Sequence, residues 1–401
     1  MPFALHLLGL AVFAMGTSEF MLSGLVPDIA SDLRVSVPAA GSLTSAFAAG
    51  MIVGAPLMAA LSMRWPRRRA LLVFLVSFLL LHVLGAVTAS FEVLLATRFA
   101  GAVANAGFLA VAVATAAAMA PPGAKGRATS ILLGGVTLAC VAGVPAGAAL
   151  GQLWGWRSAF WAVALLSVPA VAAVLRSVPA TEARTGTIKS GARREVRALR
   201  SPGLMMLLLT AALVNGATFC TFTYLAPLAT SVAGIAPGWV PGLLALFGLG
   251  SFAGVTVSGR LADSRPRLLL SAGGVALVAG WAVFAALAGS PVAVAVLVFT
   301  QGALSFAVGS TLVSQVLYAA TEAPTLAGSF ATAAFNAGAA AGPWLGGLMI
   351  GAGLGYRSPV WVSASLVAVA VAVAAAAHAA ERVMDRAAGR APAGRPRTPA
   401  N

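Results

Sequence analysis

Twelve long apolar runs dominate this sequence and leave few folds open to it. A helix of about 20 apolar residues is long enough to cross the ~30 Å hydrocarbon core of a bilayer. The apolar residues are continuous instead of alternating with polar ones, which favours helices over the strands of a membrane barrel. We therefore predict an all-α membrane protein with twelve transmembrane helices. The runs lie at residues 5–27, 40–62, 70–90, 93–118, 128–151, 157–175, 203–226, 239–261, 268–289, 292–318, 326–350 and 358–379.

The composition excludes the other broad classes. Only 9% of the residues are charged and 60% are apolar, whereas soluble domains have roughly 25% charged residues. A soluble fold with this composition would have too little polar surface to face water, and disordered chains are poor in apolar residues. The first run is too long, and too poor in preceding positive charge, to be a secretory signal peptide.

The formal charge of +15 is explained by the loops between the runs. Of the 25 Lys and Arg residues, 21 lie in alternate loops and the C-terminal tail, three lie on the other side, and Arg98 lies within a run. Cytoplasmic loops of membrane proteins carry this excess of positive charge. We therefore expect both termini to be cytoplasmic in a multi-pass protein of the inner (plasma) membrane, and no nucleic-acid partner is needed to explain the charge.

The longest polar stretch between runs divides the chain into two sets of six helices. The tail that follows the last run is rich in Arg, Pro and Gly and predicts disorder. The predicted organisation is an N-terminal six-helix bundle (1–175), a cytoplasmic linker (176–202), a C-terminal six-helix bundle (203–380) and a disordered cytoplasmic tail (381–401).

The two halves repeat each other at a shift of 200 residues. The matches include Pro27 with Pro227, Pro66 with Pro266, Arg67 with Arg267, Arg157 with Arg357 and Trp161 with Trp361. A parallel repeat of six plus six helices is the plan of one large transporter class, whose substrate site lies between the halves near the midplane. Two equivalent halves that rock about a central site meet the requirement for alternating access.

Ionisable residues inside the runs are few, and each costs a few kcal/mol to insert. Glu19 lies in the first run, His82 in the third and Arg98 in the fourth. Because burial disfavours the charged form of a carboxyl and a nearby Arg favours it, Glu19 with Arg98 suits proton coupling. The alternative is a static Glu19–Arg98 pair that holds two helices together.

Other polar residues support no enzyme and no metal site. His82 could carry a proton, although a lone His in a span is more often a packing residue, and Asp28 either gates the outer mouth or lies in a solvated loop. Cys140 and Cys220 lie inside apolar runs and predict neither a disulfide nor a metal site. With three His and no H-E-x-x-H motif, we expect no catalytic residues, no metal and no cofactor beyond the proton as coupling ion.

Two loops resemble the signature of the major facilitator superfamily, G-x-L-a-D-r-x-G-r-r, between helices two and three. The second copy, residues 259–267, keeps Asp263, whereas Met63 replaces the Asp in the first copy. In the superfamily the Asp engages a helix N-terminus and nearby Arg and so holds one conformation. The resemblance implies a conformational latch made of Arg64, Arg67, Asp263 and Arg267.

Small residues in runs five and eleven resemble the antiporter motif of drug:proton exchangers. The longer pattern G-x-x-x-G-P-x-x-G-G is complete in run eleven, at 338–347. Small residues four apart let helices pack closely, and Pro bends them. The predicted helix-packing residues are Gly143, Pro145, Gly147, Gly342, Pro343 and Gly346.

With the motifs at 16–28 and 125–157, the resemblance covers nearly the whole chain. The chain resembles the twelve-helix drug:proton antiporters, and within them the actinobacterial chloramphenicol efflux proteins through stretches 15–32, 63–72 and 104–113. The resemblance implies a monomeric, non-enzymatic protein of the lipid bilayer that exports a small neutral amphipathic drug, chloramphenicol, in exchange for protons and so confers resistance. The alternative is export of another small solute, such as a sugar or a nucleoside.

In the superfamily, helices one, four, seven and ten line the cavity. Aromatic faces with a few amide and hydroxyl groups suit chloramphenicol, a neutral molecule with an aromatic ring and hydroxyl, amide and nitro groups. Carried onto this chain, the resemblance places Glu19, which we assign with Arg98 to proton coupling, among the residues that line the cavity. It implies as substrate-binding residues Phe20, Ser23, Asn105, Phe108, Asn215, Phe219, Tyr224, Gln301 and Ser305.

Overall fold

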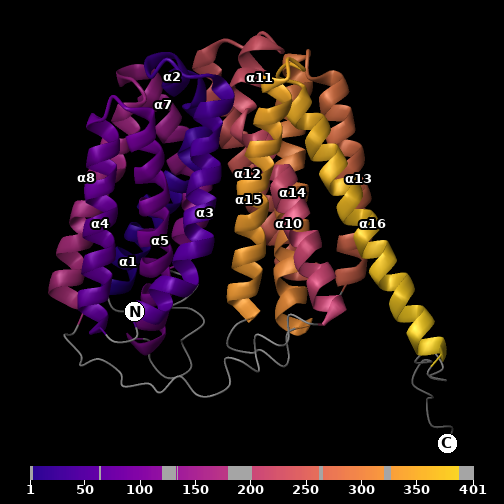
Figure 1. The fold of residues 1–401 in the computed structure, drawn as a ribbon, viewed down its shortest axis with the longest axis horizontal. Helices are drawn as coiled ribbons and strands as arrows, with labels where there is room; N and C mark the ends of the chain where they lie inside the picture. Colours follow the sequence, from indigo (N-terminus) through magenta and orange to yellow (C-terminus); the bar gives the residue numbers. More distant parts are fainter. Residues whose placement is uncertain are drawn as a thin grey trace, which may run out of the picture.

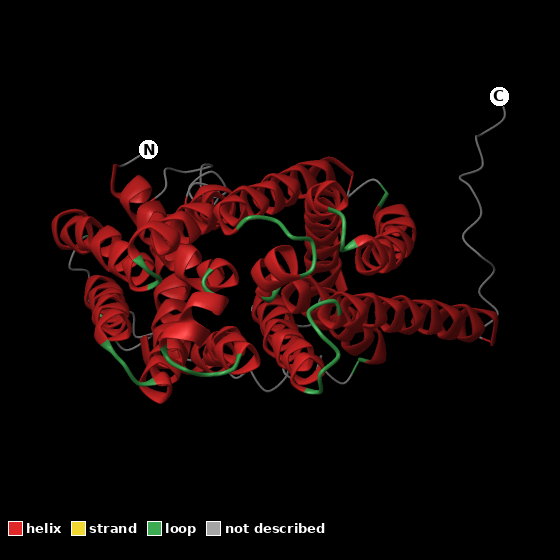
Figure 2. Ribbon diagram, turned by 90° about the horizontal axis from the view of Figure 1, so that it is seen from above, coloured by secondary structure: helices red, strands yellow, loops and turns green. Residues whose placement is uncertain are grey.

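Helices make up all the regular structure in the part of the chain that the computed structural model describes, so the all-α prediction is confirmed (Figure 2). The described residues are 3–62, 65–119, 132, 134–178, 201–261, 265–319 and 327–387. Eleven helices among them are long and apolar enough to cross a membrane. The remaining predicted run, the eleventh, forms α15 (Ala327–Gly351), whose hydropathy is lowered by Asn336, Pro343 and its glycines. The chain is a multi-pass membrane protein.

The first half of the chain forms one group of helices, on the left in Figure 1. In this group α5 packs on α3 and α4, and α8 packs on α1 and α4. A π-helical turn, η2, interrupts the fifth predicted helix. The elements are α1 (Phe3–Phe20), η1 (Met21–Gly24), α2 (Val26–Asp32), α3 (Val37–Ser62), α4 (Arg67–Val87), α5 (Phe91–Met119), η2 (Ala139–Gly143), α7 (Val144–Trp154) and α8 (Arg157–Ser177).

The second half forms the other group, on the right in Figure 1. In this group α14 packs on α12 and α13, and α10 packs on α15 and α16. The start of α1 lies at the bottom of Figure 1, as do the end of α8 and the start of α10, the helices on either side of the linker. We call this side of the molecule the linker end. The opposite side, where α2 and α11 lie, is the far end. The elements are α10 (Pro202–Thr223), α11 (Leu225–Ser231), η4 (Pro237–Trp239), α12 (Val240–Leu261), α13 (Pro266–Leu287), α14 (Pro291–Ala319), α15 (Ala327–Gly351) and α16 (Ser358–Ala387).

The 200-residue repeat is also visible in the backbone. Gly155 and Gly355 adopt φ angles of 78° and 72°, which L side chains rarely adopt, immediately before α8 and α16. Ser158 and Ser358 each donate a side-chain hydrogen bond of 2.7 Å to the carbonyl of the matching glycine. The same turn therefore starts the last helix of each half.

The two groups contact each other through the far halves of their helices. The Tyr224 ring lies between Gly41 of α3 and Gly347 of α15, and its hydroxyl donates to the Pro343 carbonyl at 2.8 Å. At the far end Gln152 donates to the Pro237 carbonyl, which joins α7 to η4. These contacts close the far end of the space between the groups.

Candidate functional site

A cavity of about 260 Å³ lies between the two groups of helices. Its lining comes from α1 on one side and from α10, α14 and α15 on the other. Glu19 is the ionisable residue among those that line it. The lining residues are Glu19, Phe20, Val214, Asn215, Thr218, Phe219, Ser305, Phe306, Gly309, Ser310, Val313, Phe335, Asn336 and Ala339.

Aromatic rings and neutral polar groups give the cavity its chemistry. The rings of Phe20 and Phe219 face each other across the two groups, with centroids 5.6 Å apart. The Asn215 amide donates to the Phe335 carbonyl at 2.7 Å, and the Asn336 amide donates to the Thr332 carbonyl at 2.9 Å. Both bonds use an N–H, so the acceptor oxygen of each amide stays available to a ligand.

Ser305 adds a hydroxyl that has no partner. Its side chain is buried, and its oxygen has no hydrogen bond to any described residue. Because an unpartnered buried hydroxyl costs free energy, a ligand that supplies the missing bond is favoured there. The cavity thus combines ring faces with groups that accept or donate single hydrogen bonds.

Behind Glu19, a buried hydrogen-bonded chain holds Arg98. The Arg98 guanidinium donates to the Ser18 hydroxyl at 2.8 Å and to the Ser18 carbonyl at 2.9 Å. The Ser18 hydroxyl lies 2.6 Å from His82 Nε2, and His82 Nδ1 lies 2.8 Å from the Phe78 carbonyl. Since a carbonyl only accepts, Nδ1 donates and Nε2 accepts from Ser18. The guanidinium also lies 4.4 Å from the centroid of the Phe47 ring.

In this arrangement Glu19 and Arg98 form no ion pair. The one ion pair among the described residues joins Asp32 and Arg157 at the far end. Two Arg98 nitrogens, Nη1 and Nη2, donate to Ser18, the neighbour of Glu19 on α1, while Glu19 lines the cavity. Hydrogen bonds from Arg98 to Ser18 join α1 to α5 here, and the choice between a static Glu19–Arg98 pair and proton coupling stays a prediction.

The far-end carboxylates have different surroundings. Hydrogen bonds from Arg157 and Trp156 hold the pKa of Asp32 below its usual value. Asp28 is exposed on α2, and partial desolvation raises its pKa. Neither residue lines the cavity.

The structure brings together part of the set of residues that the sequence predicts. Glu19, Phe20, Asn215, Phe219 and Ser305 line the cavity. The other predicted binding residues lie outside its lining. These are Ser23 in η1, Asn105 and Phe108 in α5, Tyr224 and Gln301.

Tyr224 and Gln301 have structural partners instead. Tyr224 joins the two groups at the far end through Gly41 and Pro343, as described above. The Gln301 amide donates to the Leu277 carbonyl at 3.2 Å and packs against Gly280, so it lies between α13 and α14.

Several lining residues are absent from the predicted set. Asn336 and Phe335 lie on α15, Thr218 and Phe306 each adjoin a predicted residue in the sequence, and Ser310 lies further along α14. The prediction was restricted to helices one, four, seven and ten, so it excluded α15. An Asn within an apolar run was the available signal for Asn336, because a buried amide needs a partner.

The predicted packing motifs lie at equivalent places in the two halves. A side chain at Gly143 would overlap Thr17 of α1, and one at Gly342 would overlap the Gly216 backbone of α10. Helix five therefore packs closely on helix one, as helix eleven packs on helix seven. Both contacts lie directly behind walls of the cavity.

The predicted latch lies at the linker end. Arg67 is the first residue of α4, and Arg267 is the second residue of α13. Arg64 and Asp263 lie outside the described residues, so the latch stays a prediction. Within the described part of the chain, no group of three or more His, Cys, Asp or Glu is placed to hold a metal ion, and Cys140 and Cys220 are free and buried.

A cavity that is enclosed by two repeated six-helix halves and contains one carboxyl defines a solute transporter of the membrane. The family model of the Major Facilitator Superfamily matches residues 8–332, and the chain belongs to that family. This confirms the resemblance to the superfamily that the two loop motifs indicate.

Curated relatives and solved structures agree with this assignment. The chain is 56% identical to a chloramphenicol resistance protein of Streptomyces lividans, over 92% of this chain and 95% of that protein. It is 36% identical to the inner membrane transport protein YdhP of Escherichia coli K12, over 90% and 92%. The fold is similar to that of a bacterial homolog of the human lysosomal transporter Spinster, with a TM-score of 0.73 at 19% identity over 93% and 95% of the two chains.

Proposed function

We propose that this chain exports chloramphenicol across the plasma membrane in exchange for protons, and so confers resistance to the drug. The observation that carries the proposal is the cavity between the halves, in which one carboxyl, Glu19, faces rings and neutral polar groups. The 56% identity to a chloramphenicol resistance protein supports this choice of drug.

The cavity suits a small neutral molecule that has a ring and several polar groups. Phe20 and Phe219 offer faces to an aromatic ring. The oxygens of Asn215 and Asn336 accept hydrogen bonds from hydroxyl and amide groups, and the Ser305 hydroxyl donates to a nitro or carbonyl oxygen. No cation is required of the drug, because Glu19 can be neutralised by a proton.

Glu19 is the residue that we assign to proton exchange. A carboxyl in a mostly apolar cavity is costly when charged, and water entering from one side lowers that cost. In our cycle, outward-facing Glu19 takes up a proton as the drug leaves. The neutral site then tolerates the inward-facing state, in which Glu19 releases the proton and drug binds again.

Arg98 provides the second charge of the proposed coupling. Its guanidinium donates to Ser18, the residue that precedes Glu19 on α1, and Ser18 is in turn hydrogen-bonded to His82. A rotation of α1 relative to α5 would change the distance between the two charges and hence the proton affinity of Glu19. Because α1 and α5 belong to the same half, this is a change within the first half, and the movement of the halves acts on Glu19 by changing its access to water.

The orientation follows from the loop charges, with the linker end in the cytoplasm. The described conformation, closed at the far end, then corresponds to the inward-facing half of the cycle. Twelve spans, counting α15, place both termini in the cytoplasm, and a monomer contains the complete cavity. The bundle boundaries that we propose are those of the sequence repeat, 1–175 and 203–380.

Purified protein in proteoliposomes tests the proposal directly. Uphill movement of labelled chloramphenicol is expected when a pH gradient is imposed, and a protonophore should abolish it. Because each proton that enters in exchange for a neutral drug moves a net charge, a membrane potential alone should also drive transport. Transport that ignores both gradients would refute proton exchange, and absence of chloramphenicol binding by the same protein would refute the drug.

A further inference from the structure

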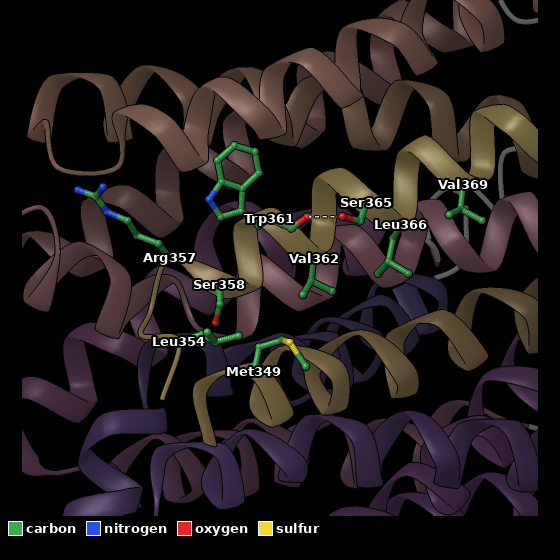
Figure 3. A pocket seen from close by; sticks show the side chains of 9 residues that line it. All are labelled: Met349, Leu354, Arg357, Ser358, Trp361, Val362, Ser365, Leu366 and Val369. Atoms are coloured by element: carbon green, nitrogen blue, oxygen red, sulfur yellow. Dashed lines mark hydrogen bonds between the residues drawn. The ribbon is translucent and has the colours of Figure 1, made fainter. Parts of the chain in front are cut away.

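A second hollow lies away from the cavity, along the outer face of α16. It has a volume of about 570 Å³ and is lined mainly by apolar side chains. Figure 3 shows these side chains along α16, with Arg357 at one end and Val369 at the other. The groove is lined by Met349, Leu354, Arg357, Ser358, Trp361, Val362, Ser365, Leu366 and Val369.

The length and direction of the groove match one leaflet of a bilayer. Its α16 residues recur at intervals of three and four, so they form one face of the helix. From Ser358 to Val369 the helix rises about 16 Å, roughly half of the ~30 Å hydrocarbon core. The groove starts at the far end of α16 and so runs inward from the far surface of the membrane.

Arg357 sits at the mouth of this groove without a partner. Its side chain is exposed, and within the described part of the chain its guanidinium has no hydrogen bond or ion pair. The Arg357 side chain extends to Gly289, since a Cβ atom added at that glycine would lie 2.9 Å from Arg357 Nη2. The guanidinium therefore lies over the connection between α13 and α14.

In the first half, the arginine equivalent to Arg357 has an acidic partner. This arginine, Arg157, lies over the corresponding connection, where it donates to the Thr88 carbonyl at 2.9 Å and pairs with Asp32. At a shift of 200 residues, Asp32 corresponds to Val232. The second half thus keeps the cation and has an apolar residue in place of its anion, at the end of the groove that Arg357 lines.

We propose that this groove binds one anionic phospholipid of the outer leaflet, with its phosphate on Arg357 and one acyl chain along α16. A guanidinium matches the geometry of phosphate oxygens and replaces the lost carboxylate. Trp361, half exposed beside it, belongs to the residue type that is enriched at the membrane interface. The assignment to the outer leaflet rests on the proposed orientation, whereas lipid binding does not depend on the transported drug.

Native mass spectrometry of the full-length protein, purified and supplied with phosphatidylglycerol, tests the proposal. One phosphatidylglycerol is expected to remain bound when the others are stripped, and diacylglycerol, which lacks the phosphate, should not be retained. Arg357→Gln should lower the retained fraction about tenfold, the equivalent of losing about 1.4 kcal/mol of binding. Arg34→Gln, which removes another exposed far-end cation outside the groove, is the matched control and should have no effect.

A second pair of variants tests the position of the acyl chain. Val362→Trp, which fills the groove, and Trp361→Ala should both reduce retention, and the equivalent Trp161→Ala in the first half should not. Equal retention by Arg357→Gln and the unaltered protein would overturn the proposal, as would equal retention of diacylglycerol. Displacement of the lipid by chloramphenicol would assign the groove to the drug instead. All of these outcomes can be read even if proton-driven export fails.

Discussion

The two halves of this transporter repeat each other in fold but differ in the chemistry that they direct at the cavity. The first half supplies Glu19 and the buried chain from Arg98 through Ser18 to His82. The equivalents of Glu19 and Arg98 in the second half are Phe219 and Val298. The second half supplies neutral polar groups to the cavity, among them Asn215, Asn336 and Ser305.

This difference indicates a division of labour. A repeat needs two halves of similar shape in order to rock, but nothing requires both to carry charge. Intramembrane charges are costly, so retaining them in one half limits that cost. We infer that the first half responds to protons and that, apart from the Phe20 ring, the groups that recognise the drug belong to the second half.

The largest effect is expected when the titratable group of the first half of the protein is removed. Glu19→Gln removes the titratable group and keeps its shape, so proton-driven export should fall to the level of empty proteoliposomes while drug binding persists. The measurement is uptake of labelled chloramphenicol under an imposed pH gradient. Asp28→Asn, a carboxylate on the same chain segment but outside the cavity, is the matched control and should retain export. Full uphill export by Glu19→Gln would remove Glu19 from the coupling.

Ser18→Ala tests the buried chain behind Glu19. It removes an acceptor of the charged Arg98 and the donor to His82, and a hydrogen bond of a charged group contributes about 1.5–3 kcal/mol. We expect a clearly lower thermal unfolding temperature in detergent and a changed pH profile of export. Ser23→Ala, at another buried serine of the same region, should change the pH profile much less. Identical pH profiles for Ser18→Ala and the unaltered protein would show that the chain has no role beyond stability.

The contact between the halves is the next target. Gly41→Ala places a methyl group against the Tyr224 ring, and overpacking of this kind costs about 1–3 kcal/mol. Since the contact exists only where the far end is closed, the population should shift toward the state that is open at that end. Distance measurements between spin labels at the far ends of α3 and α15 would detect this shift. Gly234→Ala probes a far-end glycine with open space around it and a φ of 66°, so it controls for local strain without overpacking.

Much of the architecture could be predicted from the sequence because the bilayer allows few alternatives. Apolar runs of sufficient length must be helices, and the loop charges and the repeat then determine their grouping. The predicted position of Glu19 in the cavity agrees with the structure. A carboxyl within a span is costly to expose to lipid, so it faces the interior of the bundle or a cavity.

The cavity lining was harder to predict. Whether Asn105 or Asn336 faces the cavity depends on how each helix is rotated and bent, and the small residues and prolines that set this act through contacts between distant segments. Gln301 has the residue type and the helix that were expected of a cavity amide, but its amide is hydrogen-bonded to the Leu277 carbonyl instead. Residue type alone therefore identifies the carboxyl that lines the cavity and leaves the binding surface underdetermined.

The neutral polar wall provides the test of the second half. Asn215→Ala and Asn336→Ala each remove one hydrogen bond to the drug, worth about 0.5–1.5 kcal/mol, so each should weaken chloramphenicol binding about 2- to 12-fold. Binding is measured by equilibrium dialysis of the purified protein. Asn105→Ala, a buried amide of the first half outside the cavity lining, serves as the control. If Asn105→Ala weakens binding and the other two do not, the drug lies against the first half and the division of labour is wrong.

The smallest effect on stability is expected at the ion pair between Asp32 and Arg157. The second half has Val232 at the position equivalent to Asp32. Asp32 is 45% exposed, so the pair is expected to stabilise the fold by less than about 1 kcal/mol. Because the pair lowers the pKa of Asp32 in the folded state, its stabilisation is present above the ordinary Asp pKa of about 3.9 and is lost as the pH falls through the lower, folded value. Asp32→Asn should therefore lower the unfolding temperature slightly and equally at pH 7 and pH 5, and the difference from the unaltered protein should shrink only below about pH 4. A difference that disappears between pH 7 and pH 5 would instead require a group that titrates in that range, and Asp32 would not be the residue that distinguishes the two far-end arginines.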